Sequence, residues 1–153
     1  MSQLLNFLRG IDVDPRGRSI ADIIKQDDAF LEREHSYIQW LFPLREYSHN
    51  IHDAPVIDDA EIAVAKSDER VVKNMQRSVK RMTQFYTNTD HWLQHNDHNH
   101  LRITRILKST AMLVGDDCAL GFYDLIMERV CVERAVVAPK NITYWTDAVR
   151  LSY

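Results

Sequence analysis

Apolar residues recur every three to four positions along much of this sequence, and this spacing restricts the fold more than any other feature. In the segment after Ser67, the repeating positions are Val71, Val72, Met75, Val79, Met82, Phe85 and Tyr86. A stripe of this kind covers one face of an α-helix. Only four glycines and four prolines are present, fewer than the many turns of an all-β domain would require. We therefore predict an all-α fold, with about six to seven helices in one compact domain over residues 1–153.

Polar residues with capping spacing mark where two of these helices should begin. Ser19 with Asp22, and Asp58 with Glu61, are each separated by three positions. This is the spacing of a capping box, in which two residues bond to each other's backbone and satisfy the free N–H groups of a helix start. Helices are therefore expected to open at these two places.

Prolines and a glycine are expected to separate the remaining helices. A long helix should cover residues 27–43 and end at a proline, because the residue before proline is pushed out of helical geometry. Another should cover residues 101–114 and stop at Gly115. Asp116 and Asn141 are then expected to be the N-caps of the last two helices.

The overall charge and the cysteine content exclude several classes of protein. The net charge is -3, so a strongly basic nucleic-acid binder is not expected. Cys118 and Cys131 are too few for a disulfide framework, which indicates a reducing, cytoplasmic compartment. No stretch approaches the roughly 20 apolar residues that span a bilayer. Familiar catalytic and phosphate-binding motifs, such as G-x-S-x-G or H-E-x-x-H, are missing, and no cofactor is predicted.

Two segments carry a family resemblance. Residues 37–43 (YIQWLFP) and 98–107 (HNHLRITRIL) occur in this order, with Asp53-Ala54-Pro55 between them. Together they resemble the conserved region of the opioid growth factor receptor family, over about residues 27–125. That family is named for an animal receptor that binds an enkephalin peptide and restrains proliferation. The resemblance implies a shared helical domain and a peptide or protein partner, and it implies no catalytic residues.

Four of the seven histidines lie close together and suggest a second hypothesis. They are His91, His95, His98 and His100. If residues 90–98 were helical, the first three would share a face and, perhaps with Asp97, could hold Zn²⁺ in a metal-dependent, possibly hydrolytic enzyme. The intervening asparagines and aspartate are poor helix formers and suit a turn before the next helix. A metal site is therefore not favoured.

Arg102 and Arg105 stand three residues apart and have two interpretations. Expected on the side of their helix away from the apolar stripe, they could clamp a carboxylate or a phosphate. Alternatively, they form a structural network with acidic residues near Glu32 and Glu34.

The segment before Pro43 also allows two interpretations. Trp40, next to Gln39, could form the wall of a pocket for a peptide side chain, or it could pack in the core. His35 lies within an apolar stripe and is expected to be a hydrogen-bonded core residue.

The sequence therefore favours a non-enzymatic binding or regulatory module. The candidate ligand-binding residues are Trp40, His98, Asn99, His100, Arg102 and Arg105. The ligand and the oligomeric state are not predicted.

Overall fold

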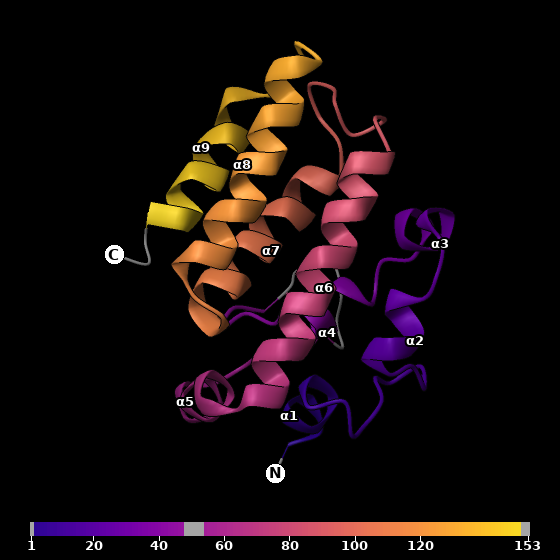
Figure 1. The fold of residues 1–153 in the computed structure, drawn as a ribbon, viewed down its shortest axis with the longest axis vertical. Helices are drawn as coiled ribbons and strands as arrows, with labels where there is room; N and C mark the ends of the chain where they lie inside the picture. The colour runs from indigo at the N-terminus through magenta and orange to yellow at the C-terminus, as the bar shows by residue number, and fades with distance from the viewer. Residues whose placement is uncertain (1, 48–53, 151–153) are drawn as a thin grey trace.

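The protein is described by a computed structural model that covers residues 2–47 and 54–150, and these residues form an all-helical fold (Figure 1). The helices are α1 (Gln3–Leu8), α2 (Ile20–Ile24), α3 (Asp28–Arg33), α4 (Ile38–Leu41), α5 (Asp59–Ser67), α6 (Glu69–Asn88), α7 (Asn99–Leu113), α8 (Asp116–Val132) and α9 (Pro139–Arg150). The all-α prediction is confirmed. The described residues form nine helices, whereas six to seven were expected. Four of the nine, α1 to α4, have only four to six residues each.

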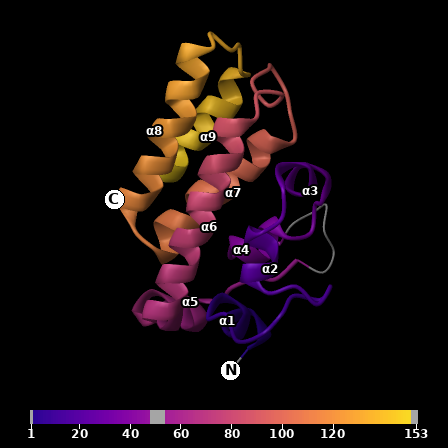
Figure 2. The same cartoon turned by 45° about the vertical axis from the view of Figure 1, so that its right-hand side comes forward.

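The longest helix, α6, organises the arrangement. It contacts α1, α2, α3 and α5 as well as α7 and α8. Helices α7, α8 and α9 pack against one another, and the short N-terminal helices lie on the other side of α6 (Figure 2). Because α6 has a continuous apolar face, it can join these two groups through one core.

The two predicted capping boxes are confirmed. In α2, the Ser19 hydroxyl accepts a bond of 3.1 Å from the Asp22 backbone N–H, and the Asp22 carboxylate accepts one of 2.9 Å from the Ser19 N–H. In α5, Asp58 and Glu61 form the same reciprocal pair at 2.8 and 3.1 Å. Residues 48–53, among them Asp53 of the family motif, lie outside the described residues.

The prediction of a single helix over residues 27–43 is wrong. Helix α3 ends at Arg33, and α4 begins only at Ile38. The carbonyl of Leu31 accepts a hydrogen bond of 2.7 Å from the Tyr37 hydroxyl, and Arg102 donates to the carbonyls of Leu31 and Glu34. These tertiary bonds satisfy carbonyls that a continuing helix would have bonded to its own N–H groups, so the chain turns there.

Two other predicted helix starts are wrong, that of α8 by one residue and that of α9 by three. Gly115, with φ of 130°, is the N-cap of α8, and Asp116 is already its first residue. Helix α9 begins at Pro139, because proline lacks the N–H that would be unsatisfied at that position. Asn141 lies inside α9, where its buried amide group is 3.2 Å from Nδ1 of His100.

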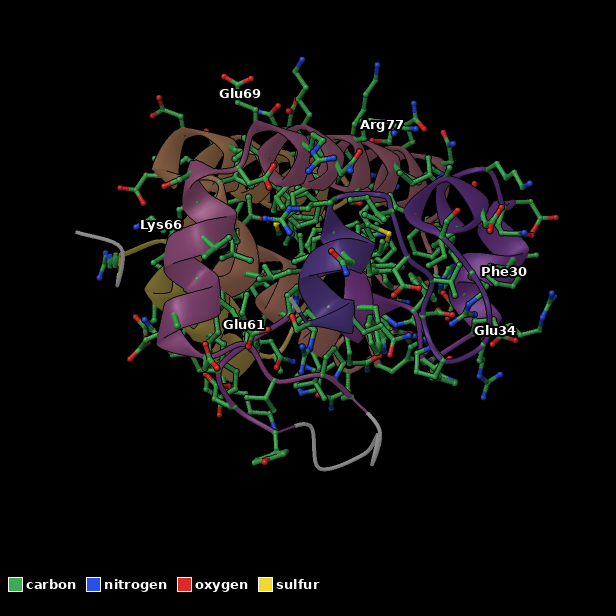
Figure 3. All side chains as sticks on the ribbon, turned by 90° about the horizontal axis from the view of Figure 1, so that it is seen from below. Phe30, Glu34, Glu61, Lys66, Glu69 and Arg77 are labelled. Carbon is green, nitrogen blue, oxygen red and sulfur yellow. The ribbon has the colours of Figure 1, made fainter. Side chains whose placement is uncertain are left out.

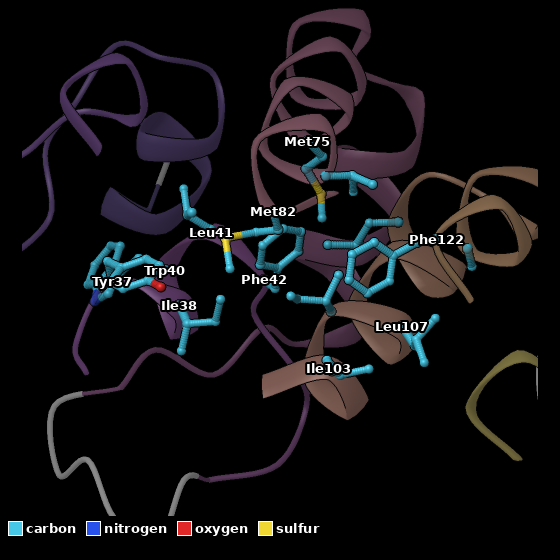
Figure 4. Close-up of a cluster of buried hydrophobic side chains, with 14 of the residues drawn as sticks. Tyr37, Ile38, Trp40, Leu41, Phe42, Met75, Met82, Ile103, Leu107 and Phe122 are labelled. Carbon is cyan, nitrogen blue, oxygen red and sulfur yellow. The ribbon is translucent and has the colours of Figure 1, made fainter. Parts of the chain in front are cut away.

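Part of the core lies where α4 meets α6, α7 and α8. Figure 4 shows Leu41 and Phe42 facing Met82 of α6, with Ile103 and Leu107 of α7 and Phe122 of α8 nearby. Charged side chains such as Glu69 and Arg77 extend outward from α6 (Figure 3). Within the described residues, no helix is both long enough and apolar enough to cross a membrane.

Candidate functional site

A hollow of about 480 Å³ lies between α7 and the segment that contains α4 and the residues after it. From α7 and its N-cap it is lined by His98, Leu101, Arg102, Thr104, Arg105 and Lys108, and from the other side by His35, Ile38, Gln39, Leu44 and Glu46. The α7 residues belong together because positions three, four and seven apart share one face of a helix.

A second hollow of about 570 Å³ continues the first along α7. Both are lined by Leu44, Glu46 and Lys108, so the two adjoin. The second extends to Gly115 at the end of α7 and has apolar residues in its wall, among them Met112. We call the two together the α7 groove.

Arg105 is a partly buried basic residue of the groove with a single hydrogen bond among the described residues. Its Nη1 donates one hydrogen bond of 3.1 Å to the carbonyl of Phe42. Among the described residues it forms no ion pair within 4.0 Å, and its Nε and Nη2 have no acceptor. Burial lowers the pKa of Arg105, against the opposing effect of the Glu46 charge. Its guanidinium is therefore a partly desolvated cation with free donors.

Arg102 points into the protein, which corrects the prediction that it lies on the outer side of α7. It is buried and donates to the backbone carbonyls of Leu31 at 2.8 Å and Glu34 at 2.5 Å. Its guanidinium also lies 5.5 Å from the centre of the Tyr37 ring. The network near Glu32 and Glu34 exists, but its acceptors are carbonyls and not carboxylates. Arg102 therefore adds charge to the groove while its donors are already engaged.

Gln39, which also lines this hollow, has an acceptor without a partner. The residue is only 7% exposed, and its Oε1 is buried without a hydrogen-bond donor among the described residues. A buried polar atom without a partner is uncommon in proteins, since it has lost its bonds to water.

His98 stands at the edge of the hollow and belongs to a cluster around Glu32. The Glu32 carboxylate lies 2.7 Å from Nε2 of His98 and 2.5 Å from Nε2 of His91, and it accepts a bond of 3.0 Å from the Asn99 amide. Burial raises the pKa of Glu32, but the bonds from Asn99 and His91 and the charges of both histidines outweigh it. The pKa is therefore lower than usual. His35, expected in the core, is exposed, with its ring 5.7 Å from that of His98.

The metal site considered as an alternative is not favoured by the structure. No group of three or more histidine, cysteine or acidic residues that could hold a metal ion occurs in the described part of the chain. The reason is that residues 89–98 are turns and bends, so no shared helical face forms. His95 is exposed, whereas His100 is buried, with Nε2 2.8 Å from the carbonyl of Trp92.

The remaining candidate residues lie in the interior. Trp40 is buried and packs edge-on against Phe7, with ring centroids 5.4 Å apart. Asn99 accepts a hydrogen bond from the Tyr86 hydroxyl at 3.1 Å, and the backbone carbonyl of His100 accepts one from the Trp145 indole at 3.0 Å. Of the six candidates, the structure therefore brings His98, Arg102 and Arg105 together at the hollow and places Trp40, Asn99 and His100 away from its lining.

Two groove residues, Lys108 and Glu46, were missed by the sequence analysis. Lys108 lies three residues after Arg105 and seven after the exposed Leu101, so the helical repeat could have identified it. Glu46 comes close to Lys108, at 3.9 Å, only through the tertiary fold. No local signal in the sequence indicates that contact.

The fold and the groove define a small all-helical domain that presents basic side chains beside one of its central helices. The family described as opioid growth factor receptor (OGFr) conserved region matches residues 1–152, and the chain belongs to this family. The motifs that carried the resemblance lie within that match.

Several curated relatives agree with this assignment. The opioid growth factor receptor of Mus musculus is 35% identical over 98% of this chain and 27% of its own length. That of Homo sapiens is 34% identical over 95% of this chain and 25% of its own length. Opioid growth factor receptor-like protein 1 of Mus musculus is 30% identical over 98% of this chain and 37% of its own length. The chain thus spans well under half of these relatives. No solved structure matches it.

Proposed function

We propose that this chain is a non-enzymatic peptide-binding domain and that its ligand lies in the α7 groove. The observation that carries the proposal is the hollow beside α7. Arg105, which is partly desolvated and has no ion pair among the described residues, lines it together with the apolar Leu101, which is 60% exposed. Exposed apolar surface next to unpaired charge is typical of a recognition site.

The charge of the hollow supports an acidic or carboxylate-bearing ligand. Three basic residues line it against one acidic residue, Glu46, although the whole chain has a net charge of -3. A local excess of positive charge on an acidic protein attracts anionic groups to that place.

The names of the relatives support a peptide as the ligand class. The mouse and human proteins are named as receptors of an opioid growth factor. Because this chain spans about a quarter of their length, the proposal concerns the conserved domain and not the activity of the whole receptors.

The proposal includes a cytoplasmic location. Cys118 and Cys131 are both free cysteines, which is compatible with a reducing compartment.

The test is a titration of the ¹⁵N-labelled protein with an enkephalin peptide, followed by NMR. We expect saturable shifts along the exposed face of α7, around Leu101 and Lys108, and none on α2, which lines neither hollow. Leu101→Gln should weaken binding at least tenfold, while Val132→Gln, at an equally exposed apolar residue of α8, should not. Saturable binding that maps elsewhere, or no binding at all, would overturn the proposal.

A further inference from the structure

We propose that the Arg105 end of the α7 groove binds the free C-terminal carboxylate of a peptide, an inference that rests on the function proposed above. Two independent features of residues that line the hollow carry it. Among the described residues, one is a guanidinium without an ion pair within 4.0 Å, and the other is a buried acceptor without a donor.

The guanidinium differs from those of three other partly buried arginines. Arg9, Arg18 and Arg81 each pair with an aspartate at 2.5 to 2.8 Å. Arg105 has only the Phe42 carbonyl among the described residues, so both Nε and Nη2 are free to donate. These two groups lie side by side and match the two oxygens of a carboxylate. Lys108 adds a second positive charge three residues further along α7. Its Nζ lies 3.9 Å from Oε1 of Glu46.

The unpaired acceptor specifies what must accompany the carboxylate. Oε1 of Gln39 needs an N–H donor, and a carboxylate alone has none to offer. The last residue of a peptide has both groups, because its backbone N–H and its carboxylate are attached to the same Cα. Once the Gln39 side chain turns its buried Oε1 toward the hollow that the residue lines, a peptide C-terminus can bond Arg105 and Gln39 at once. The carboxylate of an acidic side chain lies further from its own N–H.

The rest of the lining suits the side chain of that last residue. Ile38, Leu44 and Leu101 border the same hollow as Arg105 and Gln39. A C-terminal residue with an apolar side chain would bury it against them, which adds a hydrophobic contribution to the polar bonds. Glu46 lies at the same edge and disfavours a ligand with additional negative charge.

The smallest probe with all three features is N-acetylleucine, and its matched control is N-acetylleucinamide, which lacks only the carboxylate. Titrated into the ¹⁵N-labelled protein, the acid should shift the Arg105 Nε–H and Gln39 side-chain signals, and it should bind at least tenfold more tightly than the amide. Equal affinity of acid and amide would overturn the proposal without the need for any variant.

Variants then assign the effect to the residues. Arg105→Gln should remove the preference for the acid, whereas Arg70→Gln, at an arginine that is 62% exposed, pairs with Asp68 and lines neither hollow, should leave it unchanged. Lys108→Gln should weaken acid binding severalfold, and as a change on a partly exposed side chain it provides a second test if Arg105→Gln does not fold. An acid preference that survives both changes would contradict the assignment.

Further probes separate this inference from the proposed function. If an enkephalin peptide binds the groove equally well as the free acid and as the C-terminal amide, peptide binding stands and carboxylate recognition fails. If N-acetylleucine binds as expected but the enkephalin peptide does not, the carboxylate site stands and that peptide is not its ligand. N-acetylaspartamide has only a side-chain carboxylate. If it binds more tightly than N-acetylleucine, the site recognises internal acidic residues, and the proposal of a C-terminal carboxylate is overturned.

Discussion

Replacing Arg102 with methionine should destabilise the protein strongly, although the residue lies at the edge of a candidate binding site. Methionine preserves much of the apolar contact of the side chain and removes the guanidinium. The two shortest bonds lost are those to the carbonyls of Leu31, at 2.8 Å, and Glu34, at 2.5 Å.

The magnitude follows from the number and burial of these bonds. A hydrogen bond to a charged group contributes about 1.5–3 kcal/mol, so two such bonds amount to roughly 3–6 kcal/mol. Leu31 keeps a bond from the Tyr37 hydroxyl, and Glu34 is only partly buried, so water can reach its carbonyl. We therefore expect the lower part of this range, a loss of about 3 kcal/mol in the free energy of unfolding. For a domain of this size, that corresponds to a fall of roughly 6–12 °C in Tm.

Arg105→Met is the matched control, since Arg105 occupies the next turn of the same helix. It has a single bond to the carbonyl of Phe42 and a partly desolvated charge, so its loss should cost no more than about 1 kcal/mol. Urea unfolding followed by far-ultraviolet circular dichroism would measure both variants. Equal stability of the two variants, or an Arg102→Met protein within about 1 kcal/mol of the wild type, would refute the structural role assigned to Arg102.

Three further predictions concern pH and helix capping. The pKa of Glu32 in the folded state is below its usual 4.5. The stabilising effect of Glu32 is therefore complete above pH 4.5, and it is lost as the pH falls through the pKa of the folded state. Over that interval the urea midpoints of the wild type and Glu32→Gln should converge. Asp58→Ala, which removes the cap of α5 and the partner of Glu61, should cost about 1 kcal/mol in urea unfolding. Burial raises the pKa of Tyr37 from 10.0 to about 12, so the fold should lose stability as the pH rises above 10.0, where the unfolded chain ionises first. Tyr37→Phe should remove the phase near pH 12 from the ultraviolet titration.

Each of these predictions has its own contrary result. Parallel urea midpoints of the wild type and Glu32→Gln throughout the acid range would mean that Glu32 is not coupled to folding. An unchanged midpoint for Asp58→Ala would mean that the capping box does not stabilise α5. If Tyr37→Phe has the same alkaline titration as the wild type, Tyr37 is not buried as described.

Much of the helical architecture could be predicted from the sequence because the signals are local. The apolar repeat of α6 places Met75, Val79 and Met82 in the core, where they are buried. The capping boxes of α2 and α5 depend on residues only three positions apart, and both are formed. The two motifs of the family likewise depend only on the order of residues, and the assignment to the family is confirmed.

The site could be predicted only in part because its chemistry depends on which groups meet across the fold. Arg102 and Arg105 look alike in the sequence, three residues apart on one helix, and the spacing alone does not tell them apart. The tertiary structure directs Arg102 to the carbonyls where α3 ends. It leaves Arg105 with one bond among the described residues, at a hollow that is also lined by Gln39, whose Oε1 has no donor there.

The same physical reason explains the break after Arg33. The apolar pattern of residues 27–43 is compatible with one helix, and local propensity offers no reason to interrupt it. The interruption comes from Tyr37 and Arg102, which satisfy the carbonyls of Leu31 and Glu34 from outside the helix. The sequence by itself determined the all-α class, the capped starts of α2 and α5, and the buried face of α6. Only the tertiary structure decided where backbone and charged groups find partners, because those partners lie far away along the chain.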